Sequence, residues 1–249
     1  MAYSEGYLYG SRSLERKSDY TVSYKFIKEY LQLDDSLFNH QDNCYYLTNY
    51  CHLENRGGHR YLRPSECSKF VLKQGSHLFY NYNWTYSYHG TDPKNIKSIL
   101  QYGLKKPGSL AGDKVVKLVN GQMYGTGIYT SKIPLYSQLY APMTSWEGKY
   151  FQTILMVRQK PNSIDTQEGE GTYTTSLLGN AEIHKLYKGK ISSDEMQYIC
   201  SDESSCVLHA LLIKVHDNQY DEYHHLTDNH FTDKCLDTLM LYINGKYCW

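Results

Sequence analysis

The feature that most constrains the fold is a run of three segments, a strand-like one, a helix-like one and a second strand-like one, with glycines near their ends. The segment "TYSYHGT" predicts a strand, and "TDPKNIKSILQYGL" predicts the short helix that follows it. Thr91 or Asp92 is suited to cap this helix, and Gly103 ends it. The segment "MYGTGIYTS" then predicts a strand in which Gly125 and Gly127 allow close approach of a ligand or of neighbouring backbone.

Further segments predict a mixture of strands and helices. An amphipathic helix is expected in "YKFIKEYLQLDDSLF", because its apolar residues recur at helical spacing. Strands are expected in "CSKFVLK" and, as a central strand, in "KYFQTILMVRQ". Two more are expected in "EMQYIC" and "SCVLHALLIKVHD", joined by the turn "SDES". The pattern therefore predicts an α+β fold.

The length of the chain suits one sizeable domain, or a small module that leads into a medium one. The chain has 249 residues, enough for a sizeable core. It has 27 tyrosines, whose side chains combine an apolar ring with a polar hydroxyl. We expect a boundary near residue 78. Residues 1–78 would form a Cys- and Tyr-rich segment packed on the core, and residues 79–249 would form the main domain.

Charge and hydropathy argue against nucleic acid and membranes as partners. Lys plus Arg number 26 and Asp plus Glu number 26, so the chain lacks the broad positive charge on which nucleic-acid binding relies. The first residues show no apolar signal region, and no run of 18 apolar residues occurs. We expect a soluble protein of the cytoplasm or nucleus.

The cysteines are expected to be thiols, because seven is an odd number and no secretory signal is seen. One stretch, "CYYLTNYCHLENRGGHRYLRPSEC", gathers soft metal ligands: Cys44, Cys51, His52, His59 and Cys67. It lacks the paired C-x-x-C spacing of zinc knuckles. Packed or surface thiols are therefore favoured over a zinc site, and no metal ligand is assigned.

The ordered combination "YHGT…IL..GL…GTGIY…YS..YA" resembles the catalytic domain of the poly(ADP-ribose) polymerase-like ADP-ribosyltransferases over roughly residues 79–215. In that family a His-Gly-Ser/Thr strand is followed by a short helix, a loop over the NAD site and a Gly-x-Gly-Ile-Tyr strand. The resemblance implies an ADP-ribosyltransferase-like fold of split antiparallel sheets with flanking helices. It also implies NAD as co-substrate.

The resemblance assigns six residues to NAD: His89, Gly90, Thr91, Tyr129, Ser137 and Tyr140. His89 would hold the adenosine ribose, and the Gly90 backbone with the Ser137 hydroxyl would bind the carboxamide. Tyr129 and Tyr140 would enclose the nicotinamide ring. Ring stacking of this kind contributes about 0.5–1.5 kcal/mol per aromatic pair beyond buried area.

The sequence departs from the polymerases at the glutamate that contacts the nicotinamide ribose. The stretch "SSDEMQYIC" puts Gln197 at that position, with Glu195 two residues earlier and so on the same strand face. A glutamine carries no charge to stabilise an oxocarbenium-like transition state, so chain elongation is not expected. Two alternatives stay open for Glu195, which either replaces that glutamate or is an ordinary solvated residue.

Two functions therefore remain. The first is mono-ADP-ribosyl transfer from NAD to a protein side chain, in which His89, Tyr129, and Glu195 or Gln197 would carry the chemistry. The alternative is a weak or inactive module that binds NAD, ADP-ribose or another protein. A related fold serves RNA 2'-phosphotransferases, but the neutral charge argues against that activity.

A second resemblance favours the interaction module. The segments "CHLENRGGHRY…CSKFVLK…YHGT", "QTILMVRQKPNSI" and "ISSDEMQYICSDESSCVLHALLIKV" are similar to the C-terminal domain of the large neuralized-like proteins. Those proteins are associated with ubiquitin ligases. This resemblance reaches into the N-terminal third and would join both parts of the chain into one unit.

Overall fold

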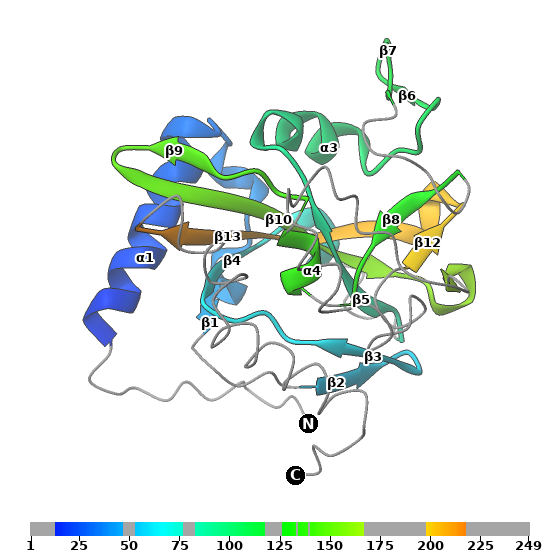
Figure 1. Ribbon diagram of the computed structural model, residues 1–249, viewed down its shortest axis with the longest axis horizontal. Coiled ribbons are helices and arrows are strands. Elements are labelled where there is room, and N and C mark those ends of the chain that lie inside the picture. The colour runs from blue at the N-terminus through cyan, green and yellow to red at the C-terminus, as the bar shows by residue number, and fades with distance from the viewer. Residues whose placement is uncertain are drawn as a thin grey trace, which may run out of the picture.

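A central antiparallel sheet organises the structure, a computed structural model, which describes residues 13–46, 53–76, 83–117, 126–132, 134–138, 140–166 and 198–217 (Figure 1). The sheet has six strands in the order β1-β4-β13-β10-β5, with β9 paired to β10. In chain order these strands are β1 (Cys44–Tyr46), β4 (Cys67–Val71), β5 (Thr85–Gly90), β9 (Thr144–Trp146), β10 (Lys149–Gln159) and β13 (Cys206–His216).

A second, three-stranded sheet lies beside the free edge of β5. It contains β8 (Ile128–Thr130), β12 (Tyr198–Cys200) and β11 (Asp165–Thr166), and β12 is its middle strand. Two hairpins complete the described strands: β2 (Leu53–Arg56) with β3 (His59–Leu62), and β6 (Leu110–Ala111) with β7 (Lys114–Val115). All strand pairs among the described residues are antiparallel, as the family resemblance implied for an α+β fold of split sheets.

The described helices lie around the sheets. They are α1 (Ser13–Lys25), α2 (Lys73–Ser76), α3 (Ile96–Tyr102) and α4 (Pro134–Gln138). Single turns occur as a π-helix at Phe26–Tyr30 and as 3-10 helices at Asp35–Leu37, His40–Asp42, Pro93–Asn95, Pro161–Ser163 and Glu203–Ser205. Within the described ranges, no helix has the length and apolar character needed to cross a membrane.

Strands β10 and β13 lie in the interior of the central sheet and pair from Tyr150 with His216 to Gln159 with Cys206, with one irregularity in register between Met156 and Val157. Their sequences are apolar on both faces because both faces are covered. One apolar cluster includes Phe26, Leu155 and Leu211 and contains residues of the N-terminal helical segment and of α3. Another apolar cluster includes Tyr61 and Met156 and contains residues of β1 and β3. Figure 1 shows α3 and the β2–β3 hairpin on opposite sides of the sheet.

The structure corrects the limits of the predicted N-terminal helix. The helical region begins at Ser13 and ends with the π-turn at Tyr30, whereas the sequence placed a helix across "YKFIKEYLQLDDSLF". Gln32 adopts a positive φ of 51°, which breaks the helical path. The Asp34 carboxylate then accepts a hydrogen bond from the Ser36 amide at 2.7 Å and begins a separate 3-10 turn.

The two late strands that the sequence predicted are present, and they belong to different sheets. Strand β12 pairs with β8 and β11, while β13 pairs with β10 and β4. Residues Glu203–Ser205 form a 3-10 turn between them, capped by the Asp202 carboxylate. The chain therefore crosses here from the small sheet to the large one.

Residues on both sides of position 78 contribute to the central sheet. Strand β4, which precedes this position, pairs with β13, and β5, which follows it, pairs with β10. The sheet thus runs through both parts of the described chain. The division into residues 1–78 and 79–249 stays a prediction.

Candidate functional site

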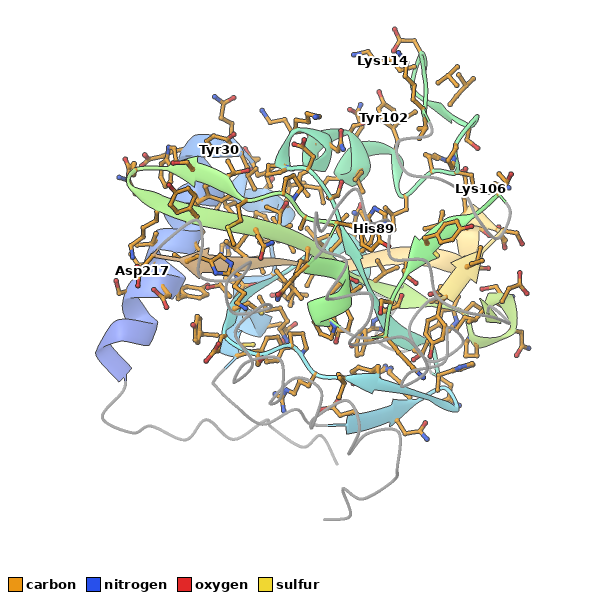
Figure 2. The ribbon with its side chains drawn as sticks, in the orientation of Figure 1. Tyr30, His89, Tyr102, Lys106, Lys114 and Asp217 are labelled. Carbon is orange, nitrogen blue, oxygen red and sulfur yellow. The ribbon has the colours of Figure 1, made fainter. Side chains whose placement is uncertain are left out.

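The two sheets meet where β5 passes β8, and His89 lies at this junction. Tyr88 and Ser131 exchange two backbone hydrogen bonds, of 2.7 Å to the Ser131 carbonyl and 2.9 Å to the Tyr88 carbonyl. Gln159 of β10 also connects the two sheets, because its buried Oε1 accepts hydrogen bonds of 3.0 Å from Ser87 of β5 and from Thr130 of β8. Figure 2 shows His89 beside β8 in the interior of the molecule.

The state of His89 follows from its partner. Its Nδ1 lies 2.9 Å from the main-chain carbonyl oxygen of Tyr129. A carbonyl only accepts, so Nδ1 must carry the hydrogen. Burial lowers the pKa of His89, and the bond to Tyr129 opposes this only in part, so the ring is neutral at pH 7. Its Nε2 is then an acceptor for a hydroxyl group.

Gly90 is required by the chain itself. A Cβ atom at this position would lie 1.8 Å from the Ser137 carbonyl oxygen and 3.1 Å from the Ala141 amide nitrogen. The backbone around α4 therefore packs directly on Gly90. The sequence analysis explained the bare backbone by the approach of a ligand, and the structure adds this internal reason for the glycine.

Ser137 and Tyr140 are brought to the junction by α4. The Ser137 hydroxyl is buried and donates a hydrogen bond of 2.9 Å to the Tyr88 carbonyl, so its oxygen is left as an acceptor. The Tyr140 amide bonds to the Ser137 carbonyl at 3.1 Å and continues the turn. Tyr129 and Tyr140 are both half-buried, which leaves part of each residue exposed.

Five of the six residues assigned to NAD therefore come together through direct contacts or along one turn: His89, Gly90, Tyr129, Ser137 and Tyr140. They come from the end of β5, from β8 and from the turn around α4, all at one junction of the sheets. A neutral imidazole acceptor, a serine hydroxyl oxygen and two half-buried tyrosines suit a ligand with ribose hydroxyls and a flat amide-bearing ring.

A comparison of the sequence with protein families identifies this region. A family model for the poly(ADP-ribose) polymerase catalytic domain matches residues 59–159. Residues 59–159 therefore carry a poly(ADP-ribose) polymerase catalytic domain. No curated protein matches the chain.

The extent of this polymerase-type domain differs from the expected resemblance. The match begins at His59, before the expected start at residue 79, and it ends at Gln159, the last residue of β10. All six residues assigned to NAD lie inside it. Domains of this family are ADP-ribosyltransferases that use NAD as substrate.

Thr91 has a different environment from the other five residues. Its side chain is buried, and its Oγ1 accepts a hydrogen bond from Asn95 Nδ2 at 3.4 Å. Its carbonyl accepts a bond of 2.9 Å from the Thr153 hydroxyl. Asp92 is the residue that caps the following 3-10 turn, through the Lys94 amide. A role for Thr91 in binding NAD stays a prediction.

Glu195 and Gln197 lie outside the described residues. The first described residue after them is Tyr198, which pairs with Thr130, and Ile199 pairs with Tyr129. Strand β12 thus runs beside the strand that carries Tyr129. Which of the two residues faces the reactive ribose stays a prediction.

The possible zinc ligands are only partly described, because Cys51 and His52 lie outside the described residues. Cys44 and Cys67 are buried, and burial raises the pKa of Cys67 to about 12, which disfavours the thiolate that zinc requires. Within the described part of the chain, no three His, Cys, Asp or Glu residues are grouped so as to hold a metal ion. The four cysteines described there form no disulfide.

Sequence reasoning missed two buried glutamines on β10 that support the site. Gln159 joins the two sheets, and Gln152 contacts the end of α4. The signal was present in "KYFQTILMVRQ", where polar residues interrupt an otherwise apolar central strand. Buried polar side chains are almost always hydrogen-bonded, so such interruptions point to specific contacts.

Proposed function

We propose that the junction between the two sheets binds NAD and that the protein transfers a single ADP-ribose unit to a protein side chain, with release of nicotinamide. The carrying observation is the hydrogen bond from His89 Nδ1 to the Tyr129 carbonyl. This bond leaves Nε2 of His89 as an acceptor for the adenosine ribose. It also connects His89 to β8, the strand that carries Tyr129, one of the two tyrosines proposed to stack on nicotinamide.

The roles of the residues follow from their chemistry. His89 Nε2 accepts a hydrogen bond from an adenosine-ribose hydroxyl, and the Gly90 backbone offers a donor and an acceptor to the carboxamide. The Ser137 oxygen, whose hydrogen is used by Tyr88, accepts from the carboxamide nitrogen. Tyr129 and Tyr140 stack on the nicotinamide ring.

Transfer of one unit fits the residue at the glutamate position. Bond cleavage between nicotinamide and ribose builds positive charge on the sugar, which a carboxylate stabilises. Gln197 lacks that charge, and Glu195 is the nearest carboxylate in the same stretch of sequence. We therefore propose transfer of a single ADP-ribose unit and not chain elongation. Glu195 or Gln197 would lie beside the nicotinamide ribose.

The alternative is a module that binds NAD or ADP-ribose without turnover, and the same glutamine favours it. It would agree with the similarity to neuralized-like proteins and with a scaffolding role near ubiquitin ligases. Either activity would place the protein in the cytoplasm or nucleus, where NAD and protein acceptors occur.

The proposed transfer is tested by incubating purified protein with labelled NAD and measuring intact mass and nicotinamide release. We expect single additions of ADP-ribose and release of nicotinamide, both lost in His89→Ala. His40→Ala is the matched control, since His40 is a half-exposed residue that pairs with Asp35 at 3.1 Å. NAD-dependent thermal stabilisation without release would establish the binding module instead.

The role of Gln197 is tested by restoring the charge. If Gln197 faces the reactive ribose, Gln197→Glu should raise the rate of NAD hydrolysis by at least about tenfold, because a carboxylate stabilises the developing positive charge. Nicotinamide release over time measures it. No increase in Gln197→Glu, together with loss of activity in Glu195→Ala, would move the role to Glu195.

A further inference from the structure

Gln152 connects the middle of the central sheet to the turn that carries Tyr140. It lies on β10 and is buried, and its Nε2 is 2.9 Å from the Ala141 carbonyl oxygen and 3.3 Å from that of Gln138. Both carbonyls belong to the turn that follows Ser137. The Gln138 carbonyl also accepts a hydrogen bond of 2.9 Å from the Ala141 amide, so Gln152 adds a second donor there and supplies a donor to the Ala141 carbonyl.

The orientation of this amide is fixed by a third contact. Because Nε2 of Gln152 donates to two carbonyls, its Oε1 must be the atom that faces His216 Nε2 at 3.1 Å. His216 therefore donates through Nε2. It is buried at the end of β13, the strand that pairs with β10. His216 thus donates a hydrogen bond to Gln152, and Gln152 donates to the carbonyls of Gln138 and Ala141.

These hydrogen bonds connect β10 to the turn that contains Tyr140. Tyr140 lies in sequence between Gln138 and Ala141, whose carbonyls Gln152 binds. The neighbouring strand β5 also contacts the turn, because Ser137 donates a hydrogen bond to the Tyr88 carbonyl and its own carbonyl packs on Gly90. The turn is thus hydrogen-bonded to two neighbouring strands, and the Gln152 amide supplies the hydrogen bonds from β10.

We propose that Gln152 and His216 are positioning residues that set the nicotinamide half of the site. This inference rests on the proposed function, because it assumes that Tyr140 and Ser137 bind nicotinamide. The adenosine half is held differently, through His89 on β5 and its bond to Tyr129 on β8. Loss of the Gln152 amide should therefore separate the two halves: nicotinamide binding weakens while ADP-ribose binding stays.

The binding experiment measures nicotinamide and ADP-ribose separately, by calorimetry, on the full chain. In Gln152→Leu we expect nicotinamide affinity to fall by at least about tenfold and ADP-ribose affinity to change by less than about twofold. His216→Leu should show the same selectivity, and His216→Gln, which keeps a donor, should restore affinity. Gln101→Leu on the exposed face of α3 is the matched control.

An equal loss for both ligands, or no loss for either, would overturn the positioning role. Hydrogen exchange provides a readout that needs no ligand. The amides of Tyr140 and Ala141, which bond to Ser137 and Gln138, should lose protection by at least about tenfold in Gln152→Leu, while amides shared by β10 and β13 keep theirs.

Unchanged protection at Tyr140 and Ala141 would overturn the inference whatever the ligands do. Failure of the wild-type protein to bind nicotinamide or ADP-ribose would contradict the proposed function, and with it the nicotinamide role. The exchange result would then show separately whether the two residues hold the turn.

Discussion

At the scale of single residues, the site depends on the missing side chain of Gly90 and on the bonded state of the His89 ring. Gly90 lets the turn around α4 approach β5, and His89 presents one nitrogen because the other is already bonded. Each position therefore serves both the packing of the chain and the proposed ligand. Substitutions here separate the two effects when stability and affinity are both measured.

Gly90→Ala should destabilise the fold strongly. The added Cβ would lie 1.8 Å from the Ser137 carbonyl oxygen, so backbone must move apart. We expect a loss of at least ~2 kcal/mol in the free energy of unfolding, measured by chemical denaturation. Ser98→Ala, at an exposed position of α3, should change it by less than ~0.5 kcal/mol. An equally small change for Gly90→Ala would mean that α4 is not packed on β5 as described.

Tyr140→Ala should weaken NAD binding by roughly 1–2 kcal/mol, or about 5- to 30-fold, because a stacked ring is lost. Calorimetric titration measures the change. Tyr30→Ala is the control: it removes an exposed tyrosine that stacks on Phe26, and Figure 2 shows Tyr30 well away from His89. Equal affinities for wild type and Tyr140→Ala would remove Tyr140 from the site.

At the scale of elements, local sequence patterns were a good guide where an element packs in one way. The strands at Thr85–Gly90 and Lys149–Gln159 and the short helix ending before Gly103 were all expected. The helix limits near Tyr30 were not, because the break depends on the positive φ of Gln32 and not on composition. The strand at Tyr198–Cys200 was expected, but the sequence did not indicate its sheet, because partners far apart in sequence decide it.

The site shows the same division. The motif that contains His89 and Ser137 was enough to predict the residues at the centre of the candidate site. Gln152 and His216 could not be assigned from the sequence because their contact joins different strands, and its geometry appears only when β10 and β13 are in register.

The turn between β12 and β13 should make stability depend on pH. Burial alone would raise the pKa of Glu203, but hydrogen bonds from Lys105, Ser109 and the Lys106 amide outweigh it and lower the pKa to about 2. A folded-state pKa below the usual value of 4.5 stabilises the protein above pH 4.5. That contribution is lost as the pH falls from about 4.5 toward 2.

Glu203→Gln should therefore cost on the order of 2–3 kcal/mol at pH 7, with the difference from wild type shrinking below pH 4. Denaturation curves across this pH range measure it. Glu147→Gln is the control, since the Glu147 side chain is 50% exposed in its pair with Lys25 and should matter little. A cost for Glu203→Gln that does not change with pH would contradict the assigned ion pair.

At the scale of the whole molecule, the proposed function depends on the joining of two sheets. The central sheet supplies His89 and the small sheet supplies Tyr129, and the Tyr88–Ser131 bonds and Gln159 hold them together. Residues 59–159, which match the family, contain β5, β8 and β10. Strand β13, which follows them, completes the support through His216.

The most direct test of this account is calorimetric titration of NAD into the wild-type protein, His89→Phe and His40→Phe at pH 7. We predict measurable binding to the wild type and to His40→Phe, and at least about tenfold weaker binding to His89→Phe, because His89 Nε2 offers the acceptor for the adenosine ribose at the sheet junction. Equal affinity in all three proteins, or no binding to the wild type, would contradict it.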